Sequence, residues 1–433
     1  MWILLCMILI MPFEKSPYLK LSSSFLGIFP EFTMIKLLGL GGLVWVVWQV
    51  AGGRLRLGLF DSAQGRLFFV FFGWVVLAGL VKGTGLTALT RYLSLVLFFP
   101  IILAAVQGER NIKQILWASV AIMVLIFPYA YRQYMRFGGR LGVGLNEPNY
   151  FALALVLLVP LAIVIARQQE ETGKRALWFL GSGVLVMSLI LTGSRGGFLG
   201  GLIAIGLLAC KIARRPCLAA GLTILALLMV VVIFPTTLGQ RLFASFQGAE
   251  VQDIGVAKST EAHADLLTAG LRMMHANPVF GVGLGKFKEQ SSVYYEVATN
   301  RIAHNTYVQI AAESGLPALL IFLLLVRCIL RSLSRSARLA SAQARPHLGA
   351  WASAMQAGLT GYLVSACFLS AQFEKFFWVM VFLSITLERH LHTAAVVREA
   401  EPTVEPAWRK WAVSSSQNGQ PAYGKGVSAV RDV

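Results

Sequence analysis

The chain has 433 residues, of which 57% are hydrophobic and only 13% are charged. A soluble core of this size could not bury so much apolar surface, so the composition excludes an ordinary soluble protein and indicates a membrane protein. The net charge of +18 does not indicate nucleic-acid binding, because the basic residues are scattered over short segments and a tail.

Apolar segments of nearly bilayer-spanning length recur along the whole chain. Each is expected to be a helix, because an open strand in lipid would leave its backbone polar groups unpaired. The first and last segments are too short to cross without their flanks, which gives a range of ten to twelve helices. The twelve segments are 1–13, 34–51, 67–81, 92–106, 115–129, 150–166, 176–192, 198–210, 218–234, 306–326, 350–370 and 376–387. The sequence therefore predicts an all-α polytopic membrane protein with about twelve transmembrane helices.

The first segment, 1–13, lacks a basic n-region and a following cleavage site, so we expect an anchor rather than a signal peptide. A hydrophilic stretch, 235–305, is far longer than a typical connection and should carry function or structure of its own. If this loop is external, Lys and Arg are more than twofold denser in the internal loops than in the external ones. Both termini are then expected in the cytoplasm.

Several arginines on the external side are not explained by this orientation, namely Arg132, Arg136, Arg140 and Arg195. One interpretation is that each extends to lipid phosphate. The other is a site for a phosphorylated ligand, because the guanidinium fork matches phosphate oxygens and keeps its charge. Arg195 fits the second interpretation best, since flanking glycines would let a ligand approach the backbone where the next helix begins.

Residues 146–150 open the sixth predicted helix on the same side. Asn146 is a plausible N-cap, and Pro148 falls in the first turn, where its missing N–H costs nothing. The alternative to a purely structural role is that Asn149 or Glu147 faces the same cavity as Arg195.

Within the long loop, residues 259–277 have the pattern of an amphipathic helix. His263 and Leu267 fall on its apolar stripe, which should lie on the membrane bundle; His263 is then either a packing residue or part of a site. The glycine run 281–285 is not a nucleotide fingerprint, because no strand–turn–helix unit surrounds it. A tight loop is expected there.

His304 lies where the tenth predicted helix starts. An imidazole at this end of the helix can exchange a proton near neutral pH. The alternative is a histidine that only caps the helix.

Four motifs now stand in order: NEPNYFAL (146–153), GSRGG (193–197), NPVFGVGLGKF (277–287) and HNTYVQIAAESGLPALLIF (304–322). Together they resemble the O-antigen ligase and polymerase superfamily, over roughly residues 140–330. The resemblance implies a membrane glycosyltransferase that needs no metal or other cofactor. It would move a glycan from an undecaprenyl-diphosphate carrier to an acceptor at the periplasmic face of the bacterial inner membrane.

The acceptor implied by the resemblance is a lipid A core, a growing polysaccharide or a protein. His304 would be the general base, Arg195 would bind the diphosphate, and Arg140 and His263 are further candidates for that role. Asn305, Asn149 and Glu147 would support them. In agreement, no Asp-x-Asp pair that could hold a divalent ion occurs in the external loop.

The sequence departs from the family pattern at His263 and Leu267, where relatives usually carry arginine and tryptophan. Either His263 acts as a partial cation, or Arg140 or another external arginine supplies the charge, or the protein is impaired. From other classes, a transporter or flippase of lipid-linked sugars would also fit the helix count, and a non-catalytic scaffold is a further alternative.

The expected organisation has four parts. Residues 1–139 form N-terminal transmembrane helices, 140–330 the ligase-like region, 331–390 C-terminal transmembrane helices, and 391–433 a disordered cytoplasmic tail.

Overall fold

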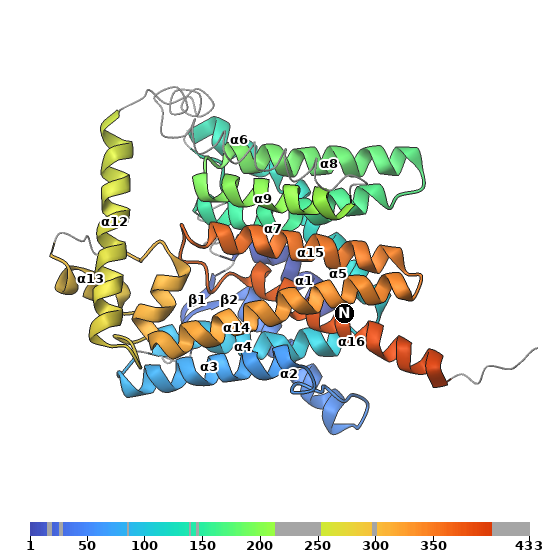
Figure 1. Cartoon of the computed structure of the whole chain (residues 1–433), viewed down its shortest axis with the longest axis horizontal. Coiled ribbons are helices and arrows are strands. Elements are labelled where there is room, and N and C mark those ends of the chain that lie inside the picture. Colours follow the sequence, from blue (N-terminus) through green and yellow to red (C-terminus); the bar gives the residue numbers. More distant parts are fainter. Residues whose placement is uncertain are drawn as a thin grey trace, which may run out of the picture. The chain divides into compact units, whose positions relative to one another are not determined.

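A computed structural model of the chain describes residues 1–14, 20–25, 29–84, 86–137, 140–143, 147–212, 253–296 and 301–400. The elements in these ranges are helical except for one short antiparallel hairpin (Figure 1). In chain order they are α1 (Trp2–Ile10), the 3-10 helix η1 (Met11–Phe13), β1 (Lys20–Phe25), β2 (Phe29–Thr33), α2 (Met34–Ala51), α3 (Ala63–Val81), α4 (Leu86–Ala105), α5 (Glu109–Leu125), α6 (Phe127–Phe137), α7 (Pro148–Arg167), α8 (Thr172–Leu191), α9 (Arg195–Ile212), α12 (Asp253–Ala276), α13 (Phe287–Tyr294), α14 (Thr306–Ala342), α15 (Pro346–Ser365) and α16 (Lys375–Ala400).

Eleven of the twelve predicted membrane segments coincide with these helices. The remaining one, 218–234, lies outside the described residues. Within the described part of the chain, eight helices are long and apolar enough to cross a bilayer. The prediction of an all-α polytopic membrane protein is confirmed, and the hairpin formed by β1 and β2 is an addition that the sequence did not indicate.

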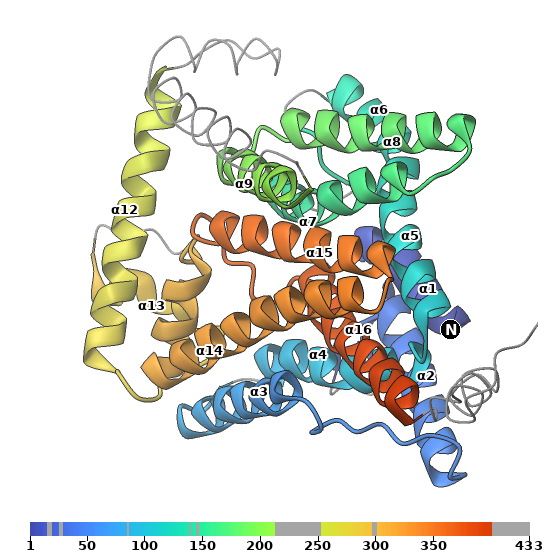
Figure 2. The ribbon, with the colours of Figure 1, turned by 45° about the vertical axis from the view of Figure 1, so that its right-hand side comes forward.

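Helix α7 lies inside the bundle. From Phe151 to Ala166 nearly all of its side chains are buried, and it packs against α5, α8, α9 and α15 (Figures 1 and 2). A helix that is apolar on every side is stable only where neighbours cover it all round. This explains why the most hydrophobic of the eight described spanning helices occupies this position.

Phenylalanine and tryptophan rings hold α3, α4 and α16 together. Phe68 is fully buried, and its ring centroid lies 5.1 Å from that of Phe99, 5.4 Å from Trp378 and 5.1 Å from Phe382. Tilted and edge-to-face contacts of this kind add to the stabilisation from burial. This cluster fixes α16 against the N-terminal helices.

Large apolar side chains also cover the outside of the helices. Leu80, Leu125 and Leu180 are 66%, 72% and 67% exposed. On a soluble protein such a surface would aggregate, whereas in a bilayer it contacts lipid. Helices α3, α5 and α8 therefore present a face that is suited to lipid.

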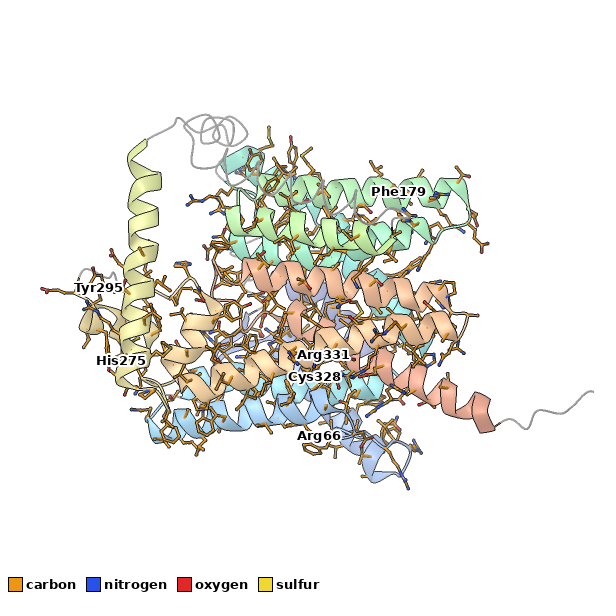
Figure 3. All side chains as sticks on the ribbon, in the orientation of Figure 1. Arg66, Phe179, His275, Tyr295, Cys328 and Arg331 are labelled. Atoms are coloured by element: carbon orange, nitrogen blue, oxygen red, sulfur yellow. The ribbon has the colours of Figure 1, made fainter. Side chains whose placement is uncertain are left out.

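Helices α12 and α13 lie beside the first turns of α14. Figure 3 shows His275 and Tyr295 at this end of the structure, away from Arg66 and Arg331. The predicted helix over 259–277 is confirmed as part of α12.

The apolar face predicted for α12 is buried only in part, and its centre lies beside the predicted stripe of His263, Leu267, Gly270 and Met274. Leu266 and Met273 are buried, whereas Leu267 is 39% exposed. The reason is close packing at Gly270, where an added Cβ would lie 2.3 Å from a side-chain carbon of Val308 on α14. That contact turns the helix so that Leu266, rather than Leu267, faces its neighbour.

Helix α16 extends to Ala400, and residues 401–433 of the predicted tail lie outside the described residues.

Candidate functional site

The turn between α8 and α9 presents Arg195. Gly193 has a φ of 60°, a conformation that glycine adopts without strain. The Ser194 hydroxyl accepts a hydrogen bond of 3.2 Å from the Gly197 N–H, in the manner of an N-cap. Arg195 is the first residue of α9, and it is exposed. A cation at the positive end of a helix dipole is unfavourable by itself, so this place suits a bound anion.

The two glycines after Arg195 allow close packing. A Cβ on Gly196 would lie 2.9 Å from the Phe368 Cβ, and one on Gly197 would lie 2.7 Å from the Ala152 Cβ. Both distances are too short for carbon atoms. The sequence suggested that these glycines let a ligand approach; the structure gives them the role of bringing α7 and residue 368 against α9.

Arg140 joins the ends of α7 and α8. Its Nε donates to the Thr192 carbonyl at 2.7 Å, and one terminal nitrogen donates to the Asn149 side-chain oxygen at 2.6 Å. Asn149 in turn donates to the Glu147 carboxylate at 2.9 Å. Burial lowers the pKa of Arg140, Glu147 opposes this, and the nearby Arg195 adds to the lowering. Arginine retains its charge under such shifts, so Arg140 and Arg195 form a pair of neighbouring cations.

The prediction that Asn146 caps α7 was wrong. The N-cap is Glu147, followed by Pro148 at the first helical position, and Asn146 lies outside the described residues. The side chain of Glu147 makes no capping bond because it accepts the hydrogen bond from Asn149 instead. Proline at the first position still fits the prediction, since it loses no helical hydrogen bond there.

His304 immediately precedes the cap of α14. The cap itself is Asn305, whose side-chain oxygen accepts from the N–H groups of Tyr307 and Val308, both at 3.0 Å. His304 has a φ of 49°, which is uncommon for a residue other than glycine. Burial lowers the pKa of His304, the Glu147 carboxylate raises it in opposition, and Arg301 lowers it. The imidazole is therefore mostly neutral at pH 7 and able to accept a proton.

Residues 366–374, here called the α15–α16 loop, connect these elements. The Thr306 hydroxyl donates to the Leu369 carbonyl at 2.6 Å and accepts from the Ala371 N–H at 2.8 Å. The Tyr150 hydroxyl donates to the Ser370 carbonyl at 3.1 Å. The beginnings of α7 and α14 are thus fixed to one loop. No motif in the sequence indicated this role.

Residues 277–287, here called the glycine segment, are fastened to α14. The N–H groups of Val282 and Gly283 donate to the carbonyls of Ala312 and Glu313 at 2.8 and 3.1 Å. The buried Glu313 side chain accepts from the Phe287 N–H at 3.4 Å. The predicted tight loop is found, and it attaches the end of the long loop to the helix that His304 precedes.

Gly315 allows the glycine segment to pack closely against α14. It has a φ of 84° and interrupts α14, and an added Cβ would lie 1.9 Å from the Val279 carbonyl oxygen. We therefore expect Gly315→Ala to lower the free energy of unfolding by about 2 kcal/mol or more, from the left-handed backbone and the clash together. The unfolding temperature in detergent measures this effect.

Gly183→Ala on α8 is the matched control, because nothing lies within 4 Å of its added Cβ. If Gly315→Ala unfolds at the same temperature as this control, the attachment is not needed for stability.

The other sequence candidates belong to α6 and α12. Arg132 and Arg136 are exposed on α6. His263 belongs to α12, but its side chain lies outside the described residues.

Comparison with known proteins agrees with the motifs. Residues 180–323 match the family model described as O-antigen ligase. This match supports the resemblance to the O-antigen ligase and polymerase superfamily. No curated protein matches the chain.

The O-antigen ligase match contains the turn at Arg195, the glycine segment and His304. Arg140, Asn149 and Tyr150 lie before the matched range, and the α15–α16 loop lies after it. The structure nonetheless joins these parts through the hydrogen bonds of Arg140 to Thr192 and of Thr306 to the loop. The candidate site therefore extends beyond the segment that matches the family model.

Proposed function

We propose that this protein transfers a glycan from an undecaprenyl-diphosphate carrier to an acceptor hydroxyl, with His304 as general base and Arg195 and Arg140 binding the diphosphate. The acceptor is a lipid A core, a growing polysaccharide or a protein side chain. His263, which stands where relatives carry arginine, is proposed as a further partial cation on the donor side.

The supporting observation is a set of interactions that links Arg140, the start of α7, the turn after α8 and His304. Arg140 bonds to the carbonyl of Thr192 in the turn that leads to Arg195. The same guanidinium is linked through Asn149 to Glu147, and Glu147 lies close enough to raise the pKa of His304 against the effect of burial. These links support the proposal of a base close to two cations, which transfer from a diphosphate requires.

The proposed reaction is a single displacement. His304 takes the proton of the acceptor hydroxyl while its oxygen attacks the anomeric carbon of the donor sugar. The bond between that carbon and the diphosphate oxygen breaks, and the electron pair leaves with the diphosphate. Negative charge accumulates there in the transition state, and fixed guanidinium groups stabilise it. Two of the N–H donors of Arg140 are engaged by Thr192 and Asn149, which holds this cation in place.

Cellular placement follows from the same proposal. The site lies at the end of the bundle where the long connection containing α12 and α13 is found. We propose that this end faces the periplasm, with both termini in the cytoplasm and the bundle in the inner membrane. The higher density of basic residues in the opposite loops supports this orientation.

We propose that the functional region comprises residues 140–330 together with the α15–α16 loop. The segments 1–139 and 331–390 otherwise serve as its transmembrane support.

The pH dependence of transfer tests the role of His304. The base must be neutral, and its pKa lies below the ordinary histidine value of 6.5. We expect the midpoint of the decline in rate at acid pH to lie below pH 6.5. Glu147→Gln removes the carboxylate that raises this pKa, so the decline should move to still lower pH. A decline centred above pH 6.5, or one that Glu147→Gln leaves in place, would contradict this assignment.

A deletion strain that carries the gene on a plasmid tests the function in cells. Wild-type protein should restore the surface polysaccharide, and without it the unused lipid-linked donor should accumulate. If the deletion strain retains its surface glycans and accumulates no donor, the proposed function is wrong.

A further inference from the structure

Tyr150 lines a pocket that the reaction described above does not use. The pocket lies between η1 with the residue after it, α5, the first turns of α7 and the beginning of α16. Its volume is about 60 Å³, which is room for roughly four water molecules. It can therefore admit one edge of a sugar ring, but not a lipid head group with several sugars.

The lining of the pocket is partly polar and partly aromatic. Glu14 and Lys375 form an ion pair at its wall, and Glu374 adds a second carboxylate. Tyr150 and Phe373 contribute aromatic rings. A few polar groups set in a largely apolar wall are typical of small-molecule sites.

The charge of this lining differs from that of the donor side. Glu14, Glu374 and Lys375 together carry one net negative charge, whereas Arg140 and Arg195 are both cations. The lining therefore offers no excess of cations that would bind a diphosphate. A neutral saccharide suits it, since carboxylates accept hydrogen bonds from hydroxyl groups and ring faces cover apolar C–H surface.

The pocket is connected to the proposed reacting groups. Tyr150 directly follows Asn149, which binds Arg140. Its hydroxyl donates to the Ser370 carbonyl, in the loop that also binds Thr306, two residues after His304. A ligand in this pocket would contact the same rigid frame that holds the proposed base.

We propose that this pocket is the acceptor subsite, and that it binds a saccharide hydroxyl edge through Glu374 and the rings of Tyr150 and Phe373. The proposal rests on the proposed glycan-transfer function. It divides the site into a cationic donor half and an anionic acceptor half.

Steady-state kinetics of the purified full-length protein in lipid nanodiscs test this division. The donor probe is the lipid-linked glycan, and the acceptor probe is the unmodified envelope saccharide, both isolated from the deletion strain. Glu374→Gln removes a carboxylate, and Ala154→Leu fills the apolar wall of the pocket without changing charge. For both variants we expect the KM for the acceptor to rise about tenfold, while the KM for the donor changes by less than about twofold.

Glu289→Gln is the matched control, because Glu289 is an exposed carboxylate on α13; it should change neither KM. The acceptor proposal is overturned if both pocket variants keep the wild-type KM for the acceptor. It is also overturned if they raise the KM for the donor instead, which would assign the pocket to the carrier lipid. If wild-type protein transfers no glycan at all, the proposed function itself fails, and the acceptor subsite fails with it.

Discussion

Replacing His304 by alanine should lower the rate of glycan transfer by about 10³-fold, the usual contribution of a positioned general base. The variant keeps the Asn305 cap and the bonds of Thr306 to the α15–α16 loop, so the protein should still fold and still bind its donor. Alanine does not favour the positive φ that His304 has. The unfolding temperature should therefore be measured beside activity. Initial rates with purified donor and acceptor give the result.

His275→Ala is the control for the loss of a histidine from the same end of the protein. His275 is exposed on α12 (Figure 3), so its removal should leave the rate unchanged. A folded His304→Ala protein that transfers glycan at the wild-type rate would show that His304 is not the base.

Arg195→Ala should lower kcat by about 10²- to 10³-fold, since it removes a fixed cation from the departing diphosphate. Arg195 is exposed at the start of α9, so this loss should come with little change in stability. Arg195→Lys should recover part of the rate, because lysine supplies the charge but not the bidentate fork. Arg140→Ala is less informative, because it also breaks the bonds to Thr192 and Asn149.

Arg132→Ala is the matched control, an exposed arginine on α6. If Arg195→Ala and Arg132→Ala reduce kcat equally, the effect is a general one of surface charge, and the diphosphate assignment to Arg195 is wrong.

The helices could be predicted because each depends on a local property of the sequence. A long apolar segment must be helical in lipid whatever its neighbours are, and α12 follows from its own periodicity. The rotation of α12 could not be predicted, since it depends on the contact of Gly270 with Val308, 38 residues later in the chain.

The candidate site, like the helices, could be predicted only where single residues or motifs mark it. Arg195, Glu147, Asn149 and His304 were selected by charge, spacing and resemblance. The structure joins Asn149 to Glu147 and to Arg140 by hydrogen bonds. The hydrogen bond from Arg140 to the Thr192 carbonyl has no local sequence pattern, because both groups can form equivalent hydrogen bonds with water. The role of the α15–α16 loop is a matter of backbone carbonyls, which every residue has, so no side-chain pattern marks it.

Glu313 shows what a family motif can contain besides catalytic residues. It is buried, and it binds the glycine segment through its side chain and its carbonyl. Some residues of the motifs 277–287 and 304–322 therefore serve to bind the two segments to each other. Such contacts hold the glycine segment against α14, the helix that His304 precedes.

The most direct test of glycan transfer follows both products of the purified protein, with doubly labelled undecaprenyl-diphosphate-linked glycan and acceptor in nanodiscs. The account predicts that each glycan joined to acceptor releases one undecaprenyl diphosphate, and that Arg195→Ala and His304→Ala reduce the two products together. Intact donor that moves across vesicle membranes while its sugar–phosphate bond stays uncleaved would contradict the account and indicate a transporter.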